Sequence, residues 1–237
     1  MFAAVRPWHA RLAGRASLDG LNALAEQSGL RTASGRAVRF VPPAPADPYY
    51  EIKVFETGCV QTRPDSLHDL FNALAWLAFP RTKARINAMH AAEIPREGGK
   101  RGRLRDLLTI LDEGGAVVCA PPPLADLVRN FSWKELFWER REETLRSMKV
   151  HVLGHATLEQ AVEARQGITC KVIFAEADGG AEPDSHAEAW LRALPPQATP
   201  RDMPPLPIFG YPGWLAASAS ADFYDDERHF RPRRAIK

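Results

Sequence analysis

The stretch from Asp65 to Phe79 constrains the fold of this chain more than any other. Its apolar residues recur at spacings of three and four, which places them on one face of an α-helix. They are Leu67, Leu70, Phe71, Leu74 and Leu77. Pro80 follows directly and ends the helix, because proline disfavours helical backbone at the residue before it. The stretch therefore predicts an amphipathic helix whose apolar stripe must be covered by a core.

Further helices are predicted on both sides of this stretch. Ser17 and Gly29 stand where helix caps are common, so a helix is expected over 17–28. Ser132 and Glu135 fit a capping box at the start of a long helix. The periodic segments predict helices over 82–92, 103–111, 132–148, 157–165 and 186–194, although 108–111 could instead be a strand.

Short runs of strand-forming residues are interspersed with these helices. The run 49–55 precedes a Thr57-Gly58 turn signal, so it is expected to pair with 59–62 as a hairpin. Other strands are predicted over 37–41, 116–120, 150–153 and 168–175. Together the patterns predict a single globular domain of the α+β class, predominantly helical, with a small mixed or antiparallel sheet.

The chain divides into three parts by composition. Residues 1–16 form an N-terminal segment, and 17–194 form the expected globular α+β domain. Residues 195–237 are rich in proline and aromatic residues and have little periodicity. Such a segment is expected to wrap over the domain instead of forming its own core.

Charge and cysteine content narrow the possible protein classes. The 31 basic and 29 acidic residues among 237 leave a net charge of +2, which argues neither for nor against a nucleic-acid partner, although a dedicated DNA binder usually has a stronger or clustered basic excess. Three cysteines without a CxxC pair indicate reduced thiols. The chain has no run of 18 apolar residues and no signal-peptide core, so no membrane span and a cytoplasmic location are expected.

The helix over 65–79 carries the first candidate site. His68 and Asn72 lie four residues apart on its polar face, and Asp69 lies beside them. A histidine, a carboxylate and an amide together could do acid–base work or bind a metal or phosphate. Asp69 could equally serve only the helix start, as part of a capping box with Ser66.

A candidate anion site follows at Pro80. Arg81 and Lys83 stand at the start of the next helix, where free backbone N–H groups attract anions. Lys83, Asn87 and His90 share one face of that helix. The alternative is an ordinary solvated polar face.

Carboxylates gather at the end of the third predicted helix. Asp106, Asp112 and Glu113 lie near Arg105. Asp106 is a candidate catalytic group, Asp112 a candidate metal ligand and Arg105 a candidate anion-binding residue, because paired carboxylates hold divalent cations. They could also be a helix surface followed by a polar turn.

Two further histidines lie four residues apart. His151 and His155 share a face in either a helix or a strand, so both are candidate metal ligands. Val152 stands where the HExxH motif requires glutamate, so no zinc protease is predicted. A third ligand is still needed, for example Glu159.

The tail interleaves aromatic residues with arginines over 223–234. Such a pattern can stack bases and contact phosphates, although Asp225 and Asp226 would repel phosphate. Docking of the tail onto its own domain is the alternative. The familiar nucleotide-loop and hydrolase fingerprints, including GxGxxG and GxSxG, do not occur.

Several of these motifs resemble a proteobacterial family catalogued only as a domain of unknown function. The resemblance covers roughly residues 20–234, and it implies one domain of bacterial, cytoplasmic origin but no known activity. The stretches that carry it are His68 to Ala73, Phe79 to Lys83, Arg105 to Glu113, Gly154 to Ala156, Pro205 to Pro207, and Phe223 to Arg234.

The residues allow two classes of function. The first is a metal-assisted hydrolase or transferase for a phosphate-bearing substrate, with an unidentified divalent ion as its cofactor. The second is a module without catalysis that binds RNA or another protein. The enzyme hypothesis requires the separate polar clusters to share one cleft.

Overall fold

The computed structural model describes residues 1–12, 16–44, 49–98, 100–163, 167–175 and 182–233. Parts of the predicted segments lie outside these ranges, among them residues 164–165 and Arg234. The helices are α1 (Arg6–Ala10), α2 (Leu18–Gln27), α3 (Tyr50–Thr57), α4 (Leu67–Ala78), α5 (Pro80–Glu93), α6 (Arg103–Gly114), α7 (Pro122–Asn130), α8 (Arg141–Ser147), α9 (His155–Val162) and α10 (Pro183–Arg192). The strands are β1 (Arg39–Val41), β2 (Cys59–Gln61), β3 (Gly115–Cys119), β4 (Lys149–Val152), β5 (Thr169–Ala175) and β6 (Pro205–Pro207). The predicted α+β fold, mostly helical with small sheets, is confirmed.

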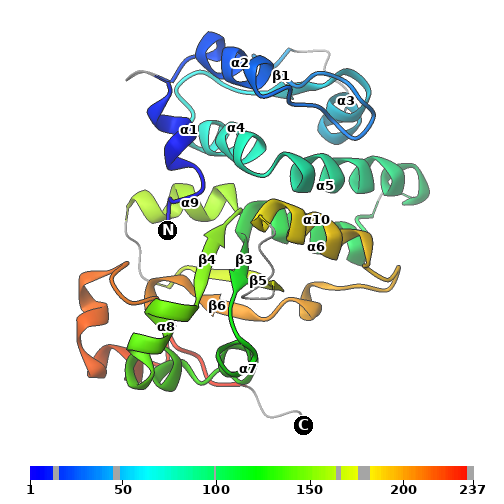
Figure 1. The fold of residues 1–237 in the computed structure, drawn as a ribbon. Coiled ribbons are helices and arrows are strands. Elements are labelled where there is room, and N and C mark those ends of the chain that lie inside the picture. Colours follow the sequence, from blue (N-terminus) through cyan, green and yellow to red (C-terminus); the bar gives the residue numbers. More distant parts are fainter. Residues whose placement is uncertain (13–15, 45–48, 99, 164–166, 176–181, 234–237) are drawn as a thin grey trace.

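Helix α4 begins and ends as the sequence predicts. The Ser66 hydroxyl accepts a hydrogen bond from the backbone N–H of Asp69 at 3.2 Å, which caps the first turn. Phe79 separates α4 from α5, and Pro80 is the first residue of α5. Trp76 is buried in addition to most of the predicted stripe, while Leu67 is exposed. The helix is therefore covered on more than one side, because other elements pack above and below it (Figure 1).

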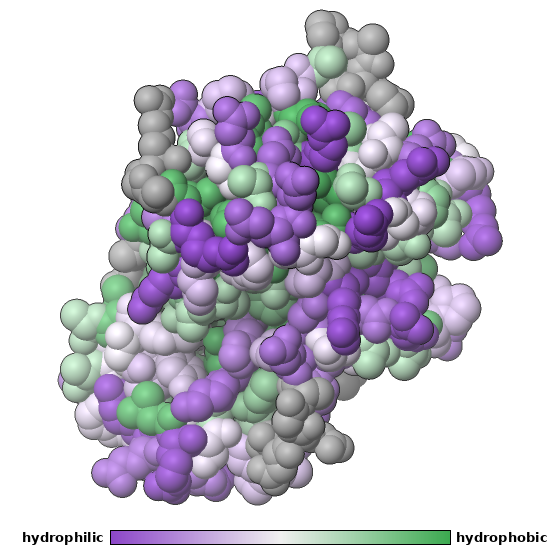
Figure 2. Space-filling view, turned by 45° about the horizontal axis from the view of Figure 1, so that its top comes forward, coloured by the Kyte–Doolittle hydropathy of each residue, from purple (hydrophilic) through white to green (hydrophobic). Residues whose placement is uncertain are grey.

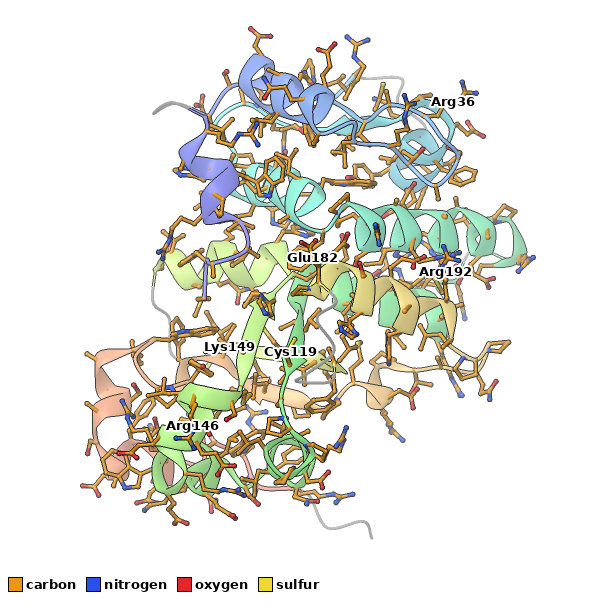
Figure 3. All side chains as sticks on the ribbon, in the orientation of Figure 1. Arg36, Cys119, Arg146, Lys149, Glu182 and Arg192 are labelled. Atoms are coloured by element: carbon orange, nitrogen blue, oxygen red, sulfur yellow. The ribbon has the colours of Figure 1, made fainter. Side chains whose placement is uncertain are left out.

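The larger sheet has the strand order β4-β3-β5-β6. Strand β3 runs parallel to β5, while the other two pairs are antiparallel, so the sheet is mixed as predicted. Cys119 of β3 lies opposite Lys149 of β4, and Figure 3 shows the two side by side. A Cβ on Gly115 would lie 2.3 Å from the Leu111 carbonyl oxygen, so glycine permits the sharp passage from α6 into β3.

The segment 49–62 differs from the prediction. Residues 50–57 form helix α3, and β2 pairs with β1 in parallel, so the predicted strand and hairpin are wrong. Gly58 has a φ of 78° and ends α3 as a left-handed cap. A hairpin turn would also place a glycine at this position, which is why the sequence suggested one. A Cβ there would lie 2.1 Å from the Ala37 carbonyl oxygen, so this crossing also requires glycine.

The predicted long helix over 132–148 is interrupted. A single π-helical stretch spans Glu135–Glu139, and α8 starts after Arg140, whose φ and ψ of −103° and 28° leave the helical region. The buried Thr144 hydroxyl donates to the Leu136 carbonyl oxygen at 2.6 Å across the break. The interruption thus keeps its freed backbone acceptor satisfied.

The elements stack in layers, which Figure 1 shows from top to bottom. The β1–β2 pair with α2 and α3 lies above α4 and α5, and α6, α9 and α10 follow before the larger sheet. One apolar cluster fills the region where α5, α6 and α10 meet strands β3 and β5. The other joins the upper layer to the tail, to α7 and to the stretch Glu135–Glu139. Polar side chains gather between the two helical layers.

The tail packs on the lower part of the molecule (Figure 1). The Tyr211 hydroxyl donates to the Met148 carbonyl oxygen at 2.8 Å, and the Trp133 indole donates to the Arg231 carbonyl oxygen at 2.9 Å. Tyr224 and Phe230 are buried there. The predicted division of the chain at 16 and 194 stays a prediction.

None of the described helices is long and apolar enough to cross a bilayer. Figure 2 shows one face on which hydrophilic side chains predominate and hydrophobic ones form small separate patches. All three cysteines are free thiols.

Candidate functional site

A polar cavity of about 560 Å³ lies between the helical layers. Its walls come from α3, α4, α5, α6 and α9, together with the segments before α3, α4 and α6. The ionisable residues that line it include His68, His90 and His155, the arginines Arg63, Arg101 and Arg105, and the acids Glu51, Asp69, Asp112 and Glu113. Members of four of the polar clusters found in the sequence, on α4, α5, α6 and α9, therefore contribute to one cavity.

Two histidines from different layers meet in this cavity. The Nε2 atoms of His68 on α4 and His155 on α9 lie 3.2 Å apart, and the rings stand nearly edge to face. The Nδ1 atom of His68 lies 2.8 Å from the Glu159 carboxylate. The Nδ1 atom of His155 lies 2.8 Å from the Asp112 carbonyl oxygen. Both rings are thus held at Nδ1 while their Nε2 atoms face each other.

The protonation of His155 follows from its partners. A carbonyl oxygen can only accept, so Nδ1 of His155 carries the hydrogen and donates it to Asp112. Burial lowers the pKa of His155 to about 4, and the nearby Asp112 opposes this only partly. The ring is therefore neutral at pH 7, and its Nε2 presents a lone pair to His68.

A buried ion pair supports the histidine pair from behind. The Lys83 ammonium donates to the carboxylate of Asp112 and, at 2.8 Å, to the side-chain oxygen of Asn72. Burial acts to raise the pKa of Asp112, but the charge and hydrogen bond of Lys83, together with the nearby His155 and His90, outweigh burial and hold the pKa below its usual range. Asn72 in turn donates to the Tyr50 hydroxyl at 3.2 Å. The residue that anchors His155 is therefore itself fixed.

Glu51 is the acid with the most unusual titration in the cavity. Burial raises its pKa to about 7, although a hydrogen bond from Asn87 favours the ionised form. The Asn87 amide donates to the Glu51 carboxylate at 2.7 Å, and its own side-chain oxygen is buried without a partner. A carboxyl group with this pKa can gain or lose a proton near neutral pH.

Arg105 faces the cavity with most of its donors engaged. Its guanidinium donates to His90 at 3.1 Å, to Glu97 at 2.7 Å and to the Tyr49 hydroxyl at 2.8 Å. Burial lowers the pKa of His90 to about 4, so this ring accepts as a neutral group. Of the five N–H groups of Arg105, those three contacts leave two for a ligand.

Asp69 lines the cavity as one half of a bidentate pair. Its carboxylate accepts from the Arg63 guanidinium at 2.8 and 2.9 Å and from the Arg63 backbone N–H at 2.7 Å. This arrangement holds Arg63 at the cavity wall. The structure thus gives Asp69 a positioning role beside its predicted place at the start of α4.

The predicted anion site at the start of α5 is already filled by the chain. The carboxylate of Asp184 accepts from the backbone N–H groups of Arg81 and Thr82 at 3.0 and 2.9 Å. The Arg81 side chain donates to Ser185, away from the cavity. The backbone N–H groups at this helix end are therefore not free for a substrate anion, because a carboxylate about 100 residues away occupies them, and the role of Arg81 stays a prediction.

Four other predicted residues also lie elsewhere. Lys83 and Asn87 are buried, have partners within the chain and do not line the cavity. Asp106 is exposed on α6 and does not line the cavity. His151 lies in β4, whereas His155 starts α9 after the turn at Gly154. The same-face argument for the two histidines fails because they belong to different elements.

The predicted metal ligands do not form a set of three. Among the residues that the structure describes, no group of three histidine, cysteine, aspartate or glutamate side chains is arranged to hold a metal ion. Asp112 touches His155 through its main-chain oxygen, and its carboxylate faces Lys83. The pair that does converge, His68 with His155, combines a predicted catalytic residue with a predicted metal ligand.

Sequence reasoning missed part of the cavity. Tyr50 and Glu51 were hidden because their segment reads as a strand, whereas in α3 they face α4 and α5. Arg63 carries no local signal beyond its place six residues before Asp69. Glu159 was visible as the residue four after His155, which places both on one face of α9.

Comparison with known proteins gives a family and no activity. No curated protein and no solved structure matches the chain. A family model described as "Protein of unknown function (DUF3025)" matches residues 38–234, which include every element that lines the cavity. This match confirms the resemblance to a family of unknown function, while its proteobacterial origin stays a prediction, and the chain belongs to that family.

Proposed function

We propose that this chain is a hydrolase or transferase that acts on a phosphate-bearing substrate at the pair His68–His155. The observation that carries the proposal is the meeting of two Nε2 atoms, 87 residues apart in sequence, at 3.2 Å in a polar cavity. Each ring is held at Nδ1, so the pair is fixed before substrate binds. Such preorganisation is what a reaction centre needs.

The arginines of the cavity support a phosphate-bearing substrate. A guanidinium group matches the oxygens of a phosphate in a bidentate manner. Arg101 is exposed at the cavity, and the Arg63 side chain is 62% exposed although it is paired with Asp69. Arg105 keeps N–H groups beyond its three internal contacts. These three side chains would hold the phosphate while the histidine pair activates the attacking group.

Glu51 would supply or take up a proton in the same cavity. Its pKa of about 7 lies near the pH at which a general acid or base is most effective. The Asn87 amide fixes the orientation of its carboxyl group. Protonation of a leaving oxygen by Glu51 would complete transfer to water or another acceptor.

Turnover on a panel of phosphomonoesters and phosphodiesters tests this proposal. The full chain should hydrolyse at least one class, and the variants H68A and H155A should each lower kcat by about 10²-fold or more. The variant H151A is the matched control, because His151 is a half-buried histidine outside the cavity. Absence of turnover on both classes, or equal activity in all three variants, would contradict the proposal.

A second candidate function is binding of single-stranded RNA without catalysis. One observation favours it: a groove of about 1110 Å³, which we call the arginine groove, is lined by Arg201, Arg228, Arg231 and Arg233. Arg228 is paired with Asp226, whereas within the described chain the other three guanidinium groups have no ion pair. The side chain of His229 also lines the groove, and its Nε2 is buried without a partner.

Salt-dependent RNA retention tests this second function. Affinity should fall steeply between low and moderate salt, because phosphate contacts release counterions. The double variant R231A/R233A should weaken binding and flatten the salt slope by about 2. The variant R36A serves as control, since Arg36 is an exposed arginine far from the groove (Figure 3). If RNA retention changes neither with salt concentration nor in the double variant, this function is ruled out.

A further inference from the structure

We infer that His68 and His155 bind one divalent transition-metal ion between their Nε2 atoms. The inference rests on the proposed function in locating the reaction at this pair, and it adds what the pair holds. The two nitrogens come from separate helices and lie 3.2 Å apart in the cavity. The two imidazole rings would need only a small adjustment to bind an ion between them.

The separation of the two nitrogens is close to that of two ligands on one ion. Histidine nitrogens bind zinc at about 2.0–2.1 Å, so two of them at a tetrahedral angle are about 3.4 Å apart. The observed 3.2 Å differs from this by a small adjustment of either side chain. A cation between the rings would therefore satisfy both nitrogens at once.

The hydrogen bonds at Nδ1 leave a lone pair on each Nε2. His155 must donate from Nδ1 to the Asp112 carbonyl oxygen, so its Nε2 is unprotonated. A neutral His68 that donates from Nδ1 to Glu159 has an unprotonated Nε2 as well. Two facing lone pairs repel each other unless a positive species lies between them. That species is either a second proton on His68 or a metal ion.

The partners of the two Nδ1 atoms favour the ion. Histidines that bind metals almost always donate their other N–H to a carboxylate or a backbone carbonyl, which fixes the ring. Glu159 provides the carboxylate for His68, and Asp112 provides the carbonyl for His155. Lys83 then holds the Asp112 side chain in place. Both rings thus have the outer contacts of metal ligands, on the correct nitrogen.

The remaining coordination positions would be open. Among the described residues no third histidine, cysteine or carboxylate joins the pair in an arrangement that holds a metal. Water and a substrate oxygen would fill the other positions, and such an open ion can activate water and polarise a phosphoryl oxygen. Imidazole ligands favour Zn²⁺, Ni²⁺ and Cu²⁺ over Mg²⁺ and Ca²⁺. Two protein ligands should bind more weakly than the four of a structural zinc site.

Direct metal titration of the full chain tests the inference without any activity assay. Chelator-treated protein should bind one Zn²⁺ per chain in calorimetry, and Mg²⁺ should not compete. The variants H68A and H155A should each lose binding, and E159Q should weaken it by about 10-fold or more. H151A should bind as the unmodified chain does. Circular dichroism of each variant separates loss of ligand from loss of fold.

The titration and NMR signals together distinguish a metal ion between the two rings from a second proton on His68. If Zn²⁺ does not bind and NMR signals show both ring nitrogens of His68 protonated, the inference is wrong and the two rings share a proton instead. Zn²⁺ binding that persists unchanged in both alanine variants would overturn it too, because the ion would lie elsewhere. Specific binding without phosphoester turnover would keep the metal site and remove the proposed function. Turnover that survives complete chelation, in a chain that binds no Zn²⁺ in the titration, would keep the proposed function and remove the metal site.

Discussion

The cavity between the helical layers and the arginine groove use their charges in opposite ways. In the cavity, Asp69, Arg105 and Asp112 each have an ionic partner within the chain. In the groove, three of four guanidinium groups have no ion pair among the described residues. Paired charges fix geometry and suit chemistry, whereas unpaired ones remain available to a large anion. Charge density alone therefore does not distinguish a reaction centre from a binding surface.

The largest expected effect comes from removing the cation behind the cavity. The variant K83M leaves the Asp112 carboxylate without its partner, and breaking a buried pair in this way costs about 3–5 kcal/mol. Urea unfolding followed by circular dichroism measures the free energy of unfolding. The double variant K83M/D112N should recover part of the loss, because no charge is then left alone. A loss below about 1 kcal/mol would show that the cavity does not depend on fixed charges.

A second prediction concerns pH and distinguishes the cavity from the groove. The pKa of Glu51 is about 7 in the folded chain and near 4.5 when unfolded, so the folded state holds its proton more tightly. Its contribution to stability is therefore full below pH 4.5 and is lost as pH rises through 7. The variant E51Q should gain about 1–3 kcal/mol relative to the unmodified chain at pH 8.

The comparison of E51Q across pH also contains its own control. At pH 4.5 the difference between E51Q and the unmodified chain should be smallest, because Glu51 is then mostly protonated in the folded state. Urea midpoints measured from pH 4.5 to 8.5 give this curve. A difference that stays constant with pH would mean that Glu51 is not shielded from water in the cavity.

A third prediction concerns the end of α5, where the chain supplies its own anion. The variant D184A removes the acceptor for the backbone N–H groups of Arg81 and Thr82, which should cost about 1–2 kcal/mol. The shift in thermal midpoint measures it. The exposed cap residue Asp202 provides the matched variant D202A, expected to cost less because its turn is short. Equal losses would mean that burial of Asp184 adds nothing.

The smallest effect is expected in the arginine groove. The double variant R231A/R233A should change the free energy of unfolding by no more than about 0.5 kcal/mol, because both side chains are exposed and have no ion pair in the described chain. Urea unfolding checks this value. A larger loss would mean that these arginines hold the tail in place, and the contrast with the cavity would disappear.

Local patterns were sufficient for most helices and for the central strands. The apolar spacing before Pro80 predicts α4, and Ser66 caps it as expected. The run 116–120 predicts β3, which the structure shows buried at the centre of the sheet. These features depend on residues a few positions apart, and that is the range over which periodicity and caps act.

The cavity depends on contacts that sequence spacing cannot show. Asp184 reaches the start of α5 across about 100 residues, and His68 meets His155 across 87. The residue types could be read from the sequence, but their roles could not, because the role of a side chain depends on the partner that it contacts. Lys83 illustrates this: its position suggests an anion site, whereas burial beside Asp112 makes it an internal cation.

The contacts around Lys83 have one further consequence. From His68 they lead to His155, then to Asp112, then to Lys83, and through Asn72 back to the helix that carries His68. They form a closed circuit through α4, α5, α6 and α9. No one of these four helices can slide without breaking two of its links, so rearrangement of the centre must be concerted.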